Sequence, residues 1–101
     1  MLNPPSYTIK SKVWLWTGKG AWHFVTVDQA ISEEIKNMFG YLSAGWGSIA
    51  AKLTICQTTW KTSLFPDKNR NGYLIPIKAE VRKKEQIKEG DEVEIKIDVL
   101  T

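Results

Sequence analysis

The sequence has very little of what catalytic or disulfide-stabilised proteins depend on. Its 101 residues include one cysteine, Cys56, and one histidine, His23. One cysteine excludes an intrachain disulfide, and neither residue has the neighbouring base or nucleophile that covalent or acid–base catalysis needs. Gly-x-Ser-x-Gly, phosphate-loop and His/Cys metal-binding spacings are also missing. We therefore expect a protein that is not an enzyme and that carries no cofactor and no metal, with a structural His23 and an inert Cys56 thiol.

Long apolar runs are missing as well. The longest uncharged stretch, residues 38–51, is interrupted by three glycines and a serine. It cannot supply the roughly 20 consecutive apolar residues of a membrane-spanning helix. The first residues also lack the basic and apolar regions of a secretory signal. A cytoplasmic protein with no membrane role is the expectation.

The composition is that of a globular protein, with 43% hydrophobic and 25% charged residues. This length suits a single domain over residues 1–101, with residues 1–6 as a loose N-terminal tail. The net charge of +3 is unevenly distributed, with a balance of +5 over residues 61–84 and −4 over residues 85–98. Such asymmetry either steers an anionic partner to one face or marks a solvated surface.

Strands dominate the predicted secondary structure. Alternating apolar and polar residues predict strands over residues 7–16, 21–27, 49–55, 60–65, 73–77 and 93–99. Pro76 indicates an edge strand or a strand end. One short helix is predicted over residues 29–39, with Asp28 as its N-cap and Gly40 ending it in the left-handed conformation. Residues 79–85 are expected to form one or two helical turns.

An internal repeat organises these elements. Residues 13–34 and 63–84 both read as strand, polar turn, strand and helical segment, at an offset of 50 residues. Because a lone hairpin is marginally stable in water, two such units are expected to complete each other. The sequence therefore predicts a mainly β fold, a small closed or partly open β-barrel.

Several motifs together resemble a known family. They are residues 60–66 (WKTSLFP), 72–78 (GYLIPIK), 81–83 (VRK), 87–93 (IKEGDEV), 20–25 (GAWHFV) and 45–47 (GWG). The chain resembles the family named domain of unknown function 1905 from about Tyr7 onwards. The resemblance implies a double-split β-barrel, related in architecture to AbrB-type transition regulators and MazE-type antitoxins. It implies no biochemical activity.

The sequence holds five tryptophans, an unusually high count for its length. Trp14 and Trp16 share a predicted strand face with Lys10 and Lys12, a combination that nucleic-acid platforms use for base stacking. The alternative, which we favour at this level, places most of the indole rings in the core, since aromatic side chains usually dominate small cores.

The basic segment supplies the main site hypothesis. Lys78 and Arg82 lie four residues apart and should project from one face of a helical turn, where like charges repel. A bound anion would relieve that repulsion; alternatively, internal acids such as Glu80 or Asp91 neutralise the pair. The hypothesis is a non-catalytic binding module for an anionic ligand or a partner protein. Its proposed contacts are Trp46, Trp60, Lys61, Ser63, Lys78 and Arg82.

Two other interpretations remain. An AbrB-like regulator could bind DNA as a dimer through Lys78, Arg82, Lys83 and Lys84, although the modest net charge disfavours nucleic acid as the partner. Residues 67–72 reproduce the start of an EF-hand loop, but Lys78 stands where the bidentate glutamate belongs. An ordinary turn is the simpler interpretation of that segment.

Overall fold

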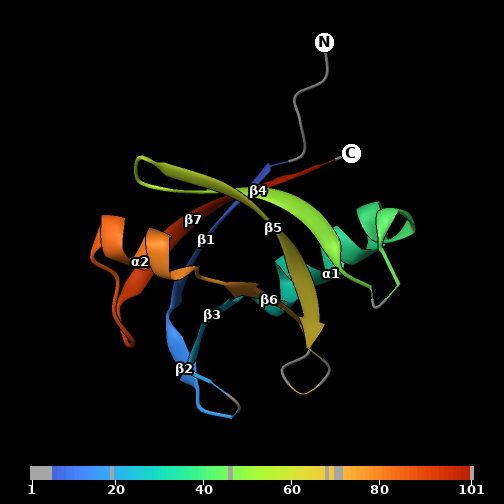
Figure 1. Cartoon of the computed structure of the whole chain (residues 1–101). Coiled ribbons are helices and arrows are strands. Elements are labelled where there is room, and N and C mark those ends of the chain that lie inside the picture. The colour runs from blue at the N-terminus through green and yellow to red at the C-terminus, as the bar shows by residue number, and fades with distance from the viewer. Residues whose placement is uncertain (1–5, 19, 46, 68, 70–71, 101) are drawn as a thin grey trace.

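The computed structural model describes residues 6–18, 20–45, 47–67, 69 and 72–100. Strands occupy most of this part of the chain (Figure 1). The elements are β1 (Ser6–Lys12), β2 (Trp14–Trp16), β3 (Trp22–Thr26), α1 (Gln29–Phe39), the 3₁₀ turn η1 (Gly40–Leu42), β4 (Ile49–Ile55), β5 (Thr58–Asp67), β6 (Gly72–Pro76), α2 (Ala79–Glu85) and β7 (Glu92–Val99).

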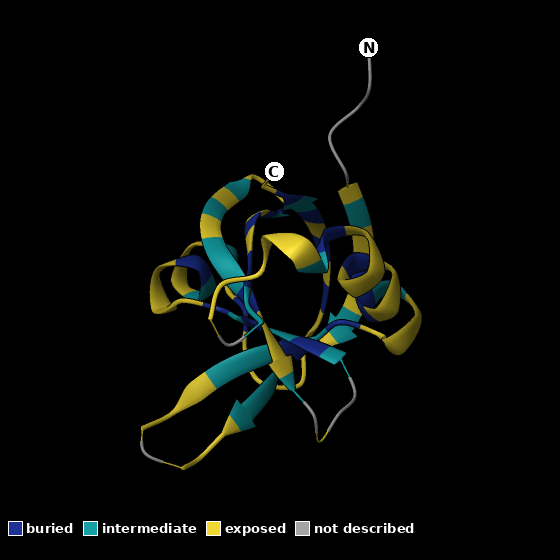
Figure 2. Cartoon of the chain, turned by 90° about the vertical axis from the view of Figure 1, so that its right-hand side faces the viewer, coloured by how far each residue is buried: buried dark blue, intermediate teal, exposed yellow. Residues whose placement is uncertain are grey.

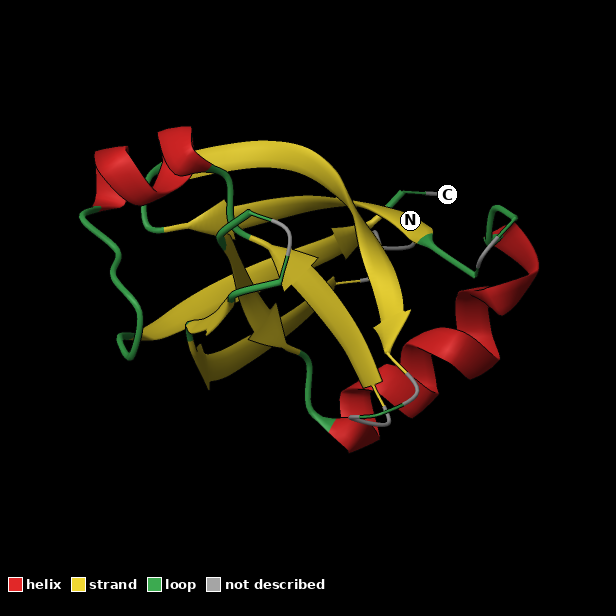
Figure 3. Cartoon of the chain, turned by 60° about the horizontal axis from the view of Figure 1, so that its bottom comes forward, coloured by secondary structure: helices red, strands yellow, loops and turns green. Residues whose placement is uncertain are grey.

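Within the described residues, seven strands form one antiparallel sheet in the order β1-β7-β4-β5-β6-β3-β2. The sheet curls into a half-barrel, and the two helices lie on opposite sides of it (Figure 1, Figure 3). The two edge strands, β1 and β2, are consecutive in the chain and are separated only by Val13. The prediction of a mainly β fold is confirmed.

The concave side of the curled sheet holds the core. Along β4, Ile49, Ala51, Leu53 and Ile55 are buried while the residues between them are not, as the alternating pattern predicts. Leu53 lies opposite Ile97 of β7, and both are fully buried. Figure 2 shows these buried stretches lining the inside of the curl, with exposed residues on the outside and on the protruding hairpin.

The two predicted hairpins pair with each other through β3 and β6. Val25 lies opposite Ile75, fifty residues further along the chain. The bonds on either side match: the Val27 N–H donates to the Tyr73 carbonyl and the Ile77 N–H to the His23 carbonyl, both at 2.9 Å. Since adding 50 to one bond's residues gives the other's, the β3–β6 ladder is symmetric about its centre. The expectation that the hairpins adjoin is confirmed.

Helix α1 has the predicted bounds and start. The Asp28 carboxylate accepts a hydrogen bond of 2.8 Å from the Ile31 N–H, so Asp28 is the N-cap. The prediction for Gly40 is wrong, because its φ of −57° and ψ of −27° are right-handed. The chain continues into η1 instead of reversing, so Gly40 needs no special conformational freedom.

Other boundaries differ modestly from the predictions. Strand β5 extends from Thr58 to Asp67, beyond the predicted residues 60–65 at both ends, because its pairing moves from β4 to β6 partway along. Pro76 ends β6, as one alternative held, but β6 lies between β5 and β3 and is not an edge. Ser6 already belongs to β1, and the rest of the predicted tail lies outside the described residues.

The helices are short. Of those in the described ranges, neither combines the length with the apolar character that crossing a bilayer requires.

Candidate ligand-binding site

The β2–β3 hairpin places four aromatic side chains on one face of the sheet. Trp14 pairs with Phe24 and Trp16 with Trp22 in the antiparallel register. Because successive side chains alternate between faces, all four rings lie on the outer face, opposite the buried Val13 and Val25.

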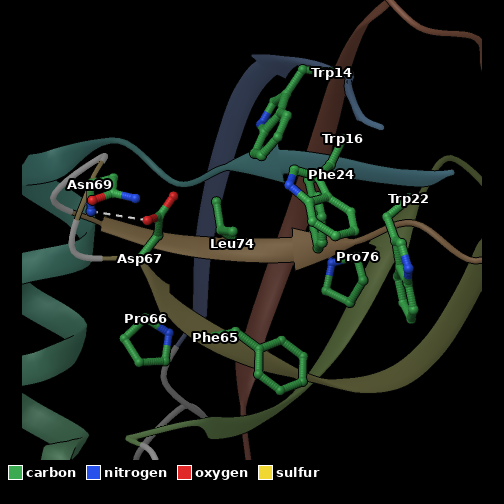
Figure 4. Close-up of a pocket in the computed structure, with 10 residues that line it drawn as sticks. All are labelled: Trp14, Trp16, Trp22, Phe24, Phe65, Pro66, Asp67, Asn69, Leu74 and Pro76. Carbon is green, nitrogen blue, oxygen red and sulfur yellow. Dashed lines mark hydrogen bonds between the residues drawn. The ribbon is translucent and has the colours of Figure 1, made fainter. Parts of the chain in front are cut away.

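These rings form one wall of a groove of about 430 Å³ that follows β6 (Figure 4). Its floor is Leu74 and Pro76, and strand β5 supplies the other wall through Phe65 and Pro66. Asp67 and Asn69 lie at one end and Trp22 at the other. This arrangement follows from the strand order, in which β6 is flanked by β3 and β5. We call it the aromatic groove.

The groove corrects the expectation that the tryptophans fill the core. Trp22 is 53% exposed and Trp16 43% exposed, and on the opposite wall Phe65 is 42% exposed. The core is instead built from aliphatic side chains with Phe39 and Tyr73, and only Trp60 among the described tryptophans packs against it. The sequence pattern was read correctly as strand, but the aromatic face was assigned to the wrong side of the sheet.

Local contacts hold the rings in place. The Trp14 and Phe24 ring centroids are 5.1 Å apart, and Trp22 stacks nearly parallel to Phe24 at 6.2 Å. The Trp14 indole N–H donates to the Thr26 hydroxyl at 2.9 Å. Gly18 has no side chain to displace the Trp16 indole, which occupies the space where a Cβ would lie. The groove wall is therefore ordered by the protein before any ligand binds.

A second, smaller hollow adjoins the aromatic groove and shares Trp22 and Pro76 with it. We call this hollow, of about 240 Å³, the cationic notch. It is lined by Ala21, Trp22, His23, Pro76, Ile77, Lys78, Ala79 and Arg82. The structure thus brings Lys78 and Arg82 to one cavity, which the four-residue spacing implied.

The charges of the notch have no acidic partner. Arg82 donates from Nε to the Ile77 carbonyl at 3.3 Å, which fixes the start of its guanidinium. Across the described residues, the ion pair within 4.0 Å is Lys10 with Glu94, far from this hollow in the sheet order. The alternative that Glu80 or Asp91 neutralises Lys78 and Arg82 is therefore wrong, and Asp91 instead accepts from the Lys88 N–H.

His23 lines the same notch from the inner face of β3. Burial lowers the pKa of its imidazole below the usual value of 6.5, and the positive charge of Arg82 lowers that pKa further, while Glu89 opposes the effect. Its Nδ1 is buried and has no hydrogen-bond partner within the described part of the chain. The imidazole is therefore neutral at physiological pH, and the positive charge of the notch comes from Lys78 and Arg82.

The remaining predicted contacts do not join the notch. Lys61 and Ser63 lie on the outer face of β5, whereas Trp60 lies on the inner face opposite Leu53. The Trp60 indole nitrogen is buried without a partner among the described residues. Trp46 lies outside the described residues. Strand alternation separates Trp60 from Lys61, and the sequence reasoning had grouped them by proximity along the chain alone.

The residues of the DNA-binding alternative need no ligand to explain them. Lys83 and Lys84 are exposed in the last turn of α2, where cations interact favourably with the helix dipole. The acidic run likewise finds partners within the fold. Glu94 and Glu92 of β7 lie opposite Lys10 and Lys12 of β1.

A third hollow, of about 550 Å³, lies beside Cys56 and several acids. Cys56 is exposed in the tight β4–β5 turn with a φ of 51°. In the part of the chain that the structure describes, no cluster of three or more His, Cys, Asp or Glu side chains could hold a metal ion. Most of the EF-hand-like segment, at residues 68, 70 and 71, lies outside the described residues.

One pattern in the sequence marks the aromatic groove. Trp14, Trp16, Trp22 and Phe24 occupy alternate positions on both strands of one hairpin, so an antiparallel pairing must gather them on one face. Phe65 and Pro76 carry no such signal, because they join the groove only through the β5–β6–β3 pairing.

The fold and the site define a small antiparallel half-barrel with a preformed surface groove. The family model described as domain of unknown function (DUF1905) matches residues 10–97, so the chain belongs to that family. Comparison with curated proteins gives no match.

Proposed function

We propose that this protein is a non-catalytic binding module whose cationic notch takes an anionic group. The observation that carries the proposal is the pairing of Lys78 and Arg82 around one cavity, with no described carboxylate within 4.0 Å of either cation. A phosphate or carboxylate there would gain charge-assisted hydrogen bonds, which are shorter and stronger than neutral ones.

The two halves of the molecule differ at this position. In the first half, Ser32 donates to the Val27 carbonyl and accepts from the Tyr73 N–H, both at 3.1 Å, which closes the space between helix and hairpin. Fifty residues later Arg82 takes the place of Ser32, and Lys78 takes that of the N-cap Asp28. Arginine and lysine have no acceptor, so the second half keeps donors where the first is self-satisfied. That difference supports a ligand site in the second half.

The absence of catalysis is part of the proposal. His23 and Cys56 line different hollows, and each lacks a described partner that would make a nucleophile–base pair. A neutral imidazole beside Arg82 suits ligand contact more than proton transfer, since the neighbouring cation opposes its protonation.

For the fold, we propose the double-split type of barrel. The support is the symmetric β3–β6 ladder, centred on Val25 and Ile75, together with the contiguous edge strands β1 and β2. The same repeat relation also equates the first turns of α1 and α2, in which the residue-32 N–H bonds the residue-28 carbonyl and the residue-82 N–H the residue-78 carbonyl.

Thermal unfolding with inorganic pyrophosphate tests the anion site. At about 10 mM pyrophosphate and a dissociation constant of about 1 mM, binding would stabilise the protein by about 1.4 kcal/mol, which raises the Tm by several degrees. Sodium chloride at matched ionic strength is the reference. We expect Lys78→Ala to remove most of this shift.

Lys83→Ala is the matched control, because it removes the same charge from the same helix but not from the notch. It should keep the full shift. A wild-type shift no larger than that of sodium chloride, or equal losses in the two variants, would contradict the anion site.

A further inference from the structure

The aromatic groove and the cationic notch form one continuous surface. They meet at Trp22 and Pro76, which line both hollows. A contiguous exposed apolar patch on a small protein marks an interaction site, and this one ends directly at two cations. Its occupant must therefore offer flat apolar groups along the groove and a negative charge at the Trp22 end.

The groove also has the shape for an extended occupant. It runs along β6 between two walls of exposed rings instead of enclosing a pocket, as Figure 4 shows. Trp22, Phe24 and Trp14 follow one another along one wall at centroid separations of 6.2 and 5.1 Å. Proteins that hold single strands without sequence preference combine exposed aromatic rings for base stacking with cations that follow the backbone.

Building on the proposed function, we propose that this surface binds single-stranded nucleic acid. Bases stack on the aromatic walls of the groove, and a backbone phosphate lies in the notch between Lys78 and Arg82. A duplex does not fit this chemistry, because its bases are already stacked on each other and present only their edges. A proline-rich peptide would suit the aromatic walls but leaves both cations without an anion.

Three variants separate the parts of this surface. Phe65 lines the groove and not the notch, Lys78 lines the notch and not the groove, and Lys83 lines neither. Phe65 is also partly exposed, so its replacement leaves the core intact. Phe65→Trp keeps a ring for stacking and serves as the conservative variant.

The experiment is fluorescence anisotropy with labelled single-stranded dT8 and U8 at about 50 mM salt. Phe65→Ala should weaken binding about 5-fold to 100-fold, the range for the loss of one stacked base, and Phe65→Trp should restore it. Lys78→Ala should weaken binding too, whereas Lys83→Ala should change it little. With two cations contributing, raising the salt to about 200 mM should reduce wild-type affinity roughly sevenfold.

Other occupants give different outcomes. Equal affinity for a duplex or for free thymidine monophosphate, a preference for a decaproline peptide over dT8, or no binding of dT8 and U8 at about 100 µM protein would each overturn the single-strand proposal. Pyrophosphate stabilisation of Phe65→Ala separates the two proposals. If it persists while the oligonucleotides do not bind, the anion site stands and only the single-strand proposal fails.

Discussion

Gly72 lies directly against Ser32, at the junction of β6 and α1. A Cβ added at Gly72 would lie 2.8 Å from the Val27 carbonyl oxygen and 3.0 Å from the Ser32 hydroxyl. The missing side chain lets the Ser32 hydroxyl bridge the Val27 carbonyl and the Tyr73 N–H. Fifty residues earlier the equivalent position holds Trp22, which forms a wall of the notch. The same place in the two halves is closed in one and open in the other.

The first prediction follows from this contact. Gly72→Ala should lower the free energy of unfolding by about 1–3 kcal/mol, since the carbonyl oxygen of Val27 is backbone and cannot move aside cheaply. Urea denaturation followed by tryptophan fluorescence measures the loss. Unchanged stability would mean that α1 and β6 are not held as closely as the structure has them.

Gly40 provides the contrasting case. Its backbone is right-handed, and the nearest atom to an added Cβ is the Lys36 Cγ at 4.0 Å. Gly40→Ala should therefore leave stability unchanged or raise it by about 0.4–1 kcal/mol, because alanine restricts the unfolded chain more than glycine does. The same urea experiment decides it. A loss of about 1 kcal/mol would instead indicate the left-handed helix end that the sequence suggested.

Lys78 is expected to serve binding at the expense of stability. It is the N-cap residue of α2, but its side chain accepts no hydrogen bond there. Lys78→Asp would supply the missing acceptor and end the repulsion with Arg82, which should stabilise the ligand-free protein by about 0.5–2 kcal/mol. The Tm without and with pyrophosphate measures both effects, and the stabilised variant should no longer respond to the anion.

Lys83→Asp makes the same change of charge in the last turn of α2, where a cation is favoured. It should not stabilise the protein. If Lys78→Asp proved less stable than the wild type, Lys78 would have to make a stabilising contact of its own.

The pH dependence of stability should carry the signature of His23. Its pKa is lowered in the folded protein, so between that value and about 6.5 the unfolded chain binds more protons. The stabilising contribution of the neutral imidazole is thus complete above about pH 6.5 and is lost as the pH falls through the folded pKa. Urea titrations from pH 7.5 to 5 measure it.

His23→Gln cancels the contribution of the carboxylates, which both proteins share. The stability of the wild type relative to this variant should fall as the pH is lowered. A constant difference across the range would show that His23 titrates alike in the folded and unfolded chains.

Local patterns along the chain determined most of the elements. The alternation in residues 49–55 and the Asp28 cap depend on neighbouring residues only, and both are present as predicted. The repeat at an offset of 50 residues also indicated that the hairpins adjoin, which the Val25–Ile75 pair confirms. These signals are readable because strand and helix periods are set by the backbone itself.

The tertiary structure decided which face of each strand is buried and which hollow each side chain lines. Period-two alternation divides residues into two faces but does not say which one faces the core, so the tryptophans of β2 and β3 could be placed only once the sheet had curled. Phe65 and Pro76, distant in sequence from Trp22, reach the groove through strand pairing alone. The sequence by itself determined the elements, their caps and their repeat, because these depend on local geometry. The groove and its cationic end arise from long-range pairing, which no local pattern records.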